Sequence, residues 1–202
     1  MPRRPRETAA GYHHVWVNAT GDWAYFLDHV DRVAWVRRLI RELAVNAWSC
    51  LAFCQLTSHV HLLLSVPDDS LPTGMRDLNR EYSQDFNVRH GRAGAFLRKR
   101  YGSRRIRDDD DLLGTYAYVV LNPVSEGMCR QPEDWYWSSY PTTLGLSDAF
   151  PFVDASSVIA AAGGSVEALD AAVKSAARTG PKRPRPEPGS GRGRAGQGGG
   201  FD

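Results

Sequence analysis

The chain has 202 residues, 42% of them hydrophobic, and its 25 Lys and Arg nearly balance its 23 Asp and Glu. This length suits one domain with or without a tail, and the apolar share is enough for a globular core. The net charge of +2 does not by itself indicate a nucleic-acid-binding protein, because phosphate contacts depend on where the cations cluster. Three cysteines are too few for a disulfide framework.

Composition divides the chain into four expected segments. They are a basic N-terminal arm (1–10), a folded domain (11–152), a single short helix within 153–179 and a disordered basic tail (180–202). The tail is rich in Pro and Gly, so it cannot bury enough apolar surface to offset its ordering entropy. No stretch approaches the roughly 18 apolar residues of a membrane span, and the first residues lack the apolar run of a secretory signal. We therefore expect a cytoplasmic protein.

Within the folded domain, hydrophobic periodicity predicts a strand, a helix, two strands and two further helices. The expected bounds are Tyr12–Asn18, Asp31–Asn46, Trp48–Gln55, Val60–Val66, Pro72–Arg89 and Asp108–Asn122. The last helix is expected to end at Asn122, because Pro123 disfavours helical geometry in the residue before it. This order predicts an α+β fold in which helices cover a central antiparallel sheet.

Two histidines, His59 and His61, lie two residues apart on a predicted strand. Because strand side chains alternate between faces, the two rings project the same way, roughly 7 Å apart. The residues between and after them, which then face the core, are Val60, Leu62 and Leu64. Such a pair is half of a site for a divalent metal; the alternative is a strand with two polar residues facing solvent. Zinc shared by Cys50 and Cys54 is disfavoured, because thiols pointing the same way on one strand would lie about 13 Å apart.

The helix expected at Asp108–Asn122 contains a tyrosine that packing does not explain. At about 100° per residue, Tyr116 lies on the apolar face, whereas Tyr118 and Asn122 lie one turn apart on another face. An off-core tyrosine beside an asparagine suits a nucleophile next to a metal ligand. The alternative is an exposed tyrosine without a function.

A cluster of cations surrounds Tyr101, and its members are Arg98, Lys99, Arg100, Arg104, Arg105 and Arg107. Cations interleaved with an aromatic residue suit phosphate contacts with single-stranded or hairpin DNA. The alternative is a solvated loop balanced by the acidic run at 108–111.

Together these motifs resemble the REP-associated tyrosine transposases, single-tyrosine relatives of the insertion-sequence transposases among the HUH nucleases. The matching segments are His59-Val60-His61, the Tyr-x-x-x-Asn-Pro-Val segment Tyr118–Val124, the Trp-Ser-Ser-Tyr segment at 135–140, and the stretches 79–91 and 94–101. The resemblance covers Tyr12 to Gly145. Two departures are Leu56-Thr57-Ser58, where the family often has Met-Pro-Asn, and Leu97-Arg98, where it has an aromatic residue and Gln.

The resemblance implies a ferredoxin-like sandwich, the HUH endonuclease fold. It implies a transposase that cleaves and rejoins single-stranded DNA at hairpin repeats through a 5′-phosphotyrosine on Tyr118. It also implies Mg²⁺ or Mn²⁺ bound by His59, His61 and Asn122. The protein would act as a monomer or homodimer and would associate with the nucleoid. A replication-initiator or relaxase-type nickase and a hairpin-binding protein that has lost catalysis remain alternatives.

Overall fold

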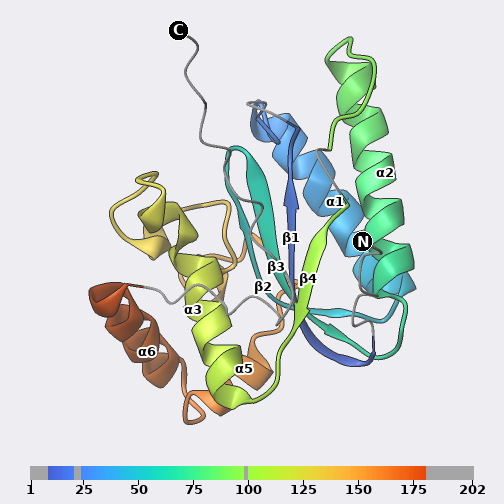
Figure 1. The fold of residues 1–202 in the computed structure, drawn as a ribbon. Coiled ribbons are helices and arrows are strands. Elements are labelled where there is room, and N and C mark those ends of the chain that lie inside the picture. The colour runs from blue at the N-terminus through green and yellow to red at the C-terminus, as the bar shows by residue number, and fades with distance from the viewer. Residues whose placement is uncertain (1–8, 21–23, 98–99, 181–202) are drawn as a thin grey trace, which may run out of the picture.

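The structure, a computed structural model, describes residues 9–20, 24–97 and 100–180. A four-stranded antiparallel sheet in the order β2-β3-β1-β4 lies at its centre (Figure 1). The strands are β1 (Gly11–Asn18), β2 (Ser49–Gln55), β3 (His59–Val66) and β4 (Gly102–Arg105). Helices α1 (His29–Val45) and α2 (Leu71–Arg89) complete the chain order β1-α1-β2-β3-α2-β4. This is the ferredoxin-like arrangement, so the predicted α+β sandwich is confirmed.

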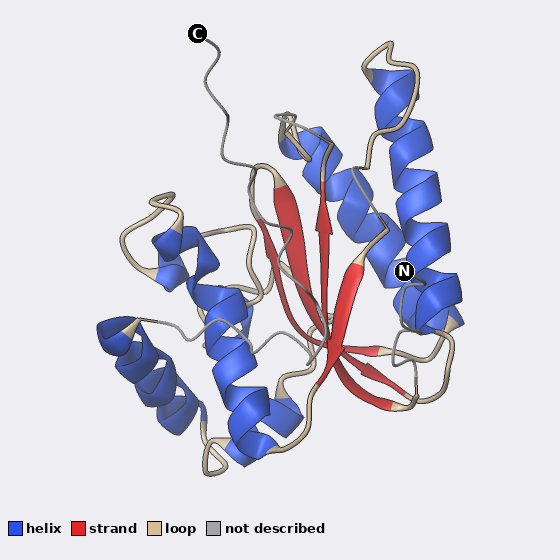
Figure 2. Cartoon of the chain, in the orientation of Figure 1, coloured by secondary structure: helices blue, strands red, loops and turns tan. Residues whose placement is uncertain are grey.

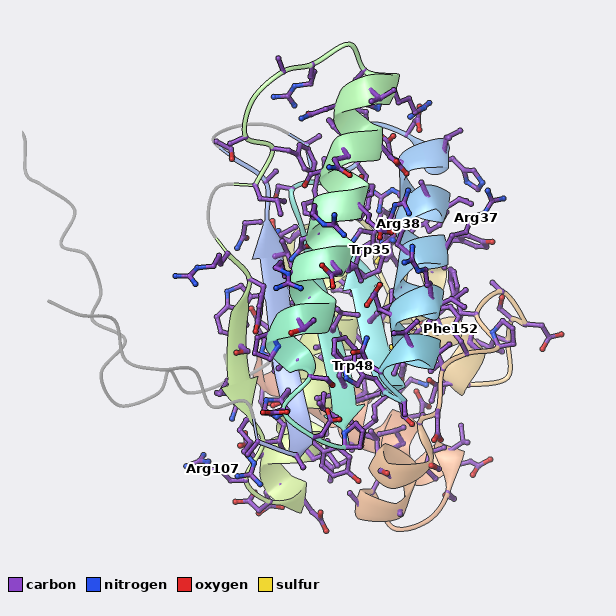
Figure 3. All side chains as sticks on the ribbon, turned by 90° about the vertical axis from the view of Figure 1, so that its right-hand side faces the viewer. Trp35, Arg37, Arg38, Trp48, Arg107 and Phe152 are labelled. Atoms are coloured by element: carbon purple, nitrogen blue, oxygen red, sulfur yellow. The ribbon has the colours of Figure 1, made fainter. Side chains whose placement is uncertain are left out.

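Helices cover both faces of the sheet (Figure 2). On one face, α1 and α2 pack over a buried cluster that includes Val15, Leu62 and Trp35. α1 begins where the Asp28 carboxylate accepts the backbone N–H of Asp31, a normal N-cap. Figure 3 looks onto this side and labels Trp35 on α1. Among the helices in the described ranges, none combines the length and hydropathy needed to cross a membrane.

The opposite face is covered by α3 (Asp109–Ser125), which packs over a second cluster that includes Leu63 and Tyr116. The expectation that this helix ends at Asn122 is wrong, since it continues through Pro123 to Ser125. A proline removes one backbone donor, but Asn122 and Pro123 are both buried, and this packing maintains the helical geometry.

Two helices, α5 (Ser156–Ala161) and α6 (Val166–Thr179), follow and pack against α3. The expectation of one short helix in this segment is wrong. Gly163 and Gly164 both have positive φ, which ends the first helix before the second begins. The side chains that these helices add to the α3 cluster are Val158, Leu169 and Val173.

The segment that includes the Trp-Ser-Ser-Tyr motif covers the outer edge of β2. The backbone N–H of Gln55 donates to the Trp137 carbonyl at 2.9 Å, and that of Ser139 donates to the Phe53 carbonyl at 3.0 Å. The Ser139 hydroxyl accepts the N–H of Phe53 at 3.1 Å. The helical turns in this region are η1 (Pro132–Asp134) and α4 (Tyr140–Thr143). This part of the motif therefore protects a strand edge.

Candidate active site

Polar side chains line the face of the sheet that α3 covers. In the register of β1 with β3, Asn18 lies opposite His59 and Trp16 lies opposite His61. In the register of β1 with β4, His14 lies opposite Arg104. Because side chains of directly opposed residues share a face, these strands bring the predicted histidine pair beside two groups that are distant in sequence.

A matching polar stripe runs along α3 and consists of Asp111, Thr115, Tyr118 and Asn122. These residues recur every three or four positions, so they share one side of the helix. At one end of the stripe, Arg104 pairs with Asp111 at 2.6 Å and donates to the Thr115 hydroxyl at 2.7 Å. Arg104 thus anchors the start of α3 to strand β4.

Tyr118 lies directly over the histidines. Its ring centroid is 5.4 Å from that of His61 and 5.7 Å from that of His14, and it meets both rings edge-on. The rings of His59 and His61 are 5.0 Å apart. Tyr116, two residues before Tyr118, is fully buried in the α3 cluster, as its helical phase predicted. The fold therefore brings together a tyrosine and the two histidines from separate parts of the sequence.

His14 is a member of the site that sequence reasoning missed. Its Nε2 lies 3.0 Å from Nδ1 of His61, and the two rings are stacked. Burial and, to a smaller extent, the Arg104 charge lower the pKa of His14 to about 3, so the ring is neutral at physiological pH. A hydrogen bond to one nitrogen of an imidazole fixes its tautomer and orientation. The sequence signal for this residue is the His13-His14 pair on a predicted strand. Because neighbouring side chains on a strand face opposite ways, only one of these two rings can face α3.

At the other end of the stripe, Asn122 and the two histidines of β3 have the chemistry to bind a divalent cation. Burial lowers the pKa of His59, which favours the neutral imidazole that binds metals, and its Nδ1 lies 3.0 Å from the Ser58 hydroxyl. The amide nitrogen of Asn122 donates to the Tyr118 carbonyl at 2.6 Å, which holds this side chain in place. Two imidazoles and an amide oxygen, completed by water or phosphate oxygens, suit a cation of this kind. In the described ranges, no three His, Cys, Asp or Glu side chains form an alternative metal cluster.

The two cysteines near the histidines lie in different parts of the core. The expectation that their thiols point the same way is wrong, because β2 has a bulge between Cys50 and Ala52. Cys50 belongs to the α1–α2 cluster and Cys54 to the α3 cluster, and both are free and buried. The bulge thus strengthens the argument against a zinc site that uses both.

The predicted DNA-binding cations differ in their surroundings. Arg100 is exposed, and Arg107, which lies just after β4 (Figure 3), is 65% exposed although its Nε pairs with Asp111 at 3.3 Å. Arg105 donates to the Ala10 carbonyl at 3.0 Å. Arg104 differs from the expectation, because its guanidinium is buried between β4 and α3 rather than presented to DNA. The two remaining cations, Arg98 and Lys99, lie outside the described residues.

Comparison with known proteins agrees with this arrangement. Over 101 residues, the chain is 29% identical to a Haemophilus influenzae protein provisionally named a REP-associated tyrosine transposase, covering 45% of this chain and 57% of that protein. Over 102 residues, it is 24% identical to the REP-associated tyrosine transposase of Escherichia coli, covering 50% of this chain and 56% of the relative. The chain thus spans little more than half the length of these curated relatives. No family model matches the sequence.

A solved structure shares the fold. It is a REP-associated tyrosine transposase bound to a REP hairpin, and it aligns with a TM-score of 0.64 at 19% identity. The alignment covers 73% of this chain and 88% of that one. The resemblance inferred from the motifs is therefore confirmed: the chain is similar in sequence to REP-associated tyrosine transposases and has the fold of one of them.

Proposed function

We propose that the chain is a metal-dependent transposase that cleaves and rejoins single-stranded DNA at hairpin repeats, with Tyr118 as its nucleophile. The observation that carries this proposal is the edge-on contact of Tyr118 with His61, whose centroids lie 5.4 Å apart. The relatives' names support strand transfer, and the hairpin in the solved relative supports a folded single strand as substrate.

The proposed reaction is a reversible transesterification. The Tyr118 oxygen attacks the scissile phosphorus and loses its proton, and the bond from phosphorus to the 3′ oxygen breaks. The products are a 5′-phosphotyrosine and a strand that ends in a 3′-hydroxyl, whose oxygen has taken up a proton. Because one phosphate diester replaces another, a 3′-hydroxyl can reverse the step and join strands without ATP.

The surrounding residues would position this chemistry. His59, His61 and Asn122 would hold Mg²⁺ or Mn²⁺, and His14 would fix the orientation of the His61 ring. When bound, such a cation polarises the scissile phosphate and offsets the charge that develops during attack. Arg104 and Asp111 fasten α3 to β4, which keeps Tyr118 over the histidines.

A hairpin oligonucleotide labelled at either end tests the proposal. In Mn²⁺ or Mg²⁺, the 3′-labelled part should stay with the protein on a denaturing gel, and the 5′-labelled part should be released. Chelation of the metal should abolish the adduct. Tyr118→Phe should bind the hairpin and form no adduct, whereas Tyr116→Phe should form it, because Tyr116 lies in the core. A nucleotide mapped to Tyr116 by mass spectrometry would contradict the assignment.

The same experiment separates the alternatives. Tight hairpin binding by the wild-type protein, with no adduct in either metal, would indicate a protein that has lost catalysis. An adduct that never rejoins an added 3′-hydroxyl strand would indicate a nickase instead of a transposase.

A further inference from the structure

The indole of Trp16 is a large aromatic group that the core does not explain. Trp16 lies on the α3-facing side of β1, directly opposite His61 on one neighbouring strand and Gly102 on the other. Its side chain is only partly buried and belongs to neither of the two hydrophobic clusters. A tryptophan at the margin of a polar site, outside the packed core, is typical of a binding surface.

Gly102 makes room for this indole. A Cβ added to Gly102 would lie 2.2 Å from Cε2 and 2.6 Å from Nε1 of Trp16, so the ring lies against the backbone of β4. Gly102 is not among the described glycines with positive φ, so its backbone conformation does not require glycine. The His14 ring contacts the indole at a centroid distance of 5.1 Å. The indole of Trp16 is therefore held by two contacts, one with the backbone of β4 at Gly102 and one with the His14 ring of the candidate site.

We propose that Trp16 is the platform on which one unpaired base of the DNA stacks, next to the phosphate that Tyr118 attacks. This inference rests on the proposed function. Directly opposed residues on neighbouring strands have their Cβ atoms about 4.5–5.5 Å apart, so the indole lies within one nucleotide of His61. Aromatic side chains bind every kind of base through its π-face. A paired base within a duplex already has neighbours on both faces, so the platform selects a single-stranded position.

Charge around the indole suits nucleic acid better than an apolar partner. Arg100 is exposed just before β4, two positions ahead of Gly102. A base stacked on Trp16 would have its phosphate close to this cation, and an aromatic platform beside a basic side chain is the usual combination in single-strand-binding grooves.

Abasic scanning of a hairpin oligonucleotide tests the platform. A single abasic nucleotide is placed in turn at each unpaired position beside the cleaved phosphate, and binding is measured by titration. For the wild-type protein, one position should weaken binding about tenfold. Trp16→Leu should weaken binding of the intact oligonucleotide by a similar factor and should abolish the penalty at that position. Trp16→Phe, which retains an aromatic ring, should keep most of both effects.

Two further variants control for loss of structure. Gly102→Ala keeps the indole but displaces it, so it should reproduce the Trp16→Leu result. Tyr136→Leu removes an aromatic side chain that is 54% exposed outside the sheet, so it should leave the abasic profile unchanged. Circular dichroism should show the same fold for every variant.

The inference and the proposed function can fail separately. If no unpaired position matters to the wild-type protein, or if the penalty persists in Trp16→Leu, the platform is excluded even while the tyrosine adduct forms. If the wild-type protein binds no hairpin at all, both proposals are overturned.

Discussion

His59 and His61 have the same proposed role but different surroundings. His61 is 5% exposed and contacts both Tyr118 and His14, and its Nδ1 lies 3.0 Å from Nε2 of His14. His59 is only partly buried and has the Ser58 hydroxyl as its neighbour. Strand alternation correctly indicated that the two rings share a face, but it could not show that a helix covers one of them.

This difference predicts unequal effects on stability. His59→Ala and His61→Ala should each abolish the tyrosine adduct, because each removes a proposed metal ligand. In urea unfolding, His59→Ala should lower the free energy of unfolding by no more than about 0.5 kcal/mol, as substitutions at the surface usually do. His61→Ala should cost about 1–3 kcal/mol, because it leaves His14 without this hydrogen-bond partner in a buried site. Equal costs would contradict the buried position of His61.

At the scale of elements, a buried ion pair joins β4 to α3. The side chains of Arg104 and Asp111 are 6% and 12% exposed, and their atoms approach to 2.6 Å. Removing one partner of such a pair leaves an uncompensated charge, which typically costs about 3–5 kcal/mol.

We therefore expect Arg104→Met to lower the free energy of unfolding by about 3–5 kcal/mol, with loss of activity because α3 holds Tyr118. Arg107→Met is the comparison: Arg107 also pairs with Asp111, at 3.3 Å, but its side chain is 65% exposed, and an exposed ion pair contributes only about 0–1 kcal/mol to the free energy of unfolding. The double variant Arg104→Met with Asp111→Leu should recover part of the loss. If the double variant loses as much free energy of unfolding as the two single variants lose together, the two residues act independently.

The same pair predicts a dependence on pH. Burial raises the pKa of Asp111, but the hydrogen bond and charge of Arg104, together with the hydrogen bonds from Arg107, lower it more, and the net pKa is below the usual value. The stabilisation is therefore complete above the unfolded-state pKa of about 3.9 and is lost as the pH falls through the folded-state value. The wild-type protein should lose more stability than Asp111→Asn between pH 5 and pH 2 in urea titrations.

The elements differed in how far sequence predicted them. The three longer strands, α1 and α2 have strong hydrophobic periodicity, and their expected positions are confirmed. β4 was missed because Gly-Ser-Arg-Arg has no apolar alternation, and it is a strand because β1 supplies its partner. The end of α3 and the division of α5 from α6 depend on packing and on positive φ at glycines, which periodicity does not describe. His14 and Trp16 reach the site through strand register, which a single sequence does not specify.

At the scale of the molecule, α3 packs against helices as well as against the sheet. It contacts both α5 and α6, and α5 also contacts β2 (Figure 1). The helix that contains Tyr118 therefore depends on a segment that contains none of the proposed site residues.

Truncation tests this dependence. A chain that ends at Phe152 loses the buried side chains of Val158, Leu169 and Val173. Each is worth about 1.5–3 kcal/mol, so the loss is comparable with the whole stability of many domains. We expect this variant to melt far below the wild type or to aggregate. A chain that ends at Gly180 retains the described packing and should melt within a few degrees of the wild type. Normal melting of the shorter chain would contradict the role of α5 and α6.

Salt dependence should locate the DNA path over the whole surface. If Arg100 and Arg107 contact phosphates, replacing either by Ala should reduce the slope of log affinity against log salt by about 0.7 for a single strand. Arg37, which is exposed on α1 on the opposite side of the sheet (Figure 3), is the control and should leave the slope unchanged. An equal effect of all three substitutions would indicate binding without a defined path.

The direction in which α3 runs has an electrostatic consequence for the site. Its first turn contains Asp109, Asp110 and Asp111, and its last turn contains no basic residue. A helix has about half a negative elementary charge at its C-terminus, where a basic side chain is usually favourable. Here that end lies close enough to His59 for the charge of Glu126, the C-cap residue, to raise the pKa of the histidine against the larger effect of burial. The helix dipole therefore favours a cation over a bare phosphate at the end that contains Asn122, which is where the proposed metal site lies.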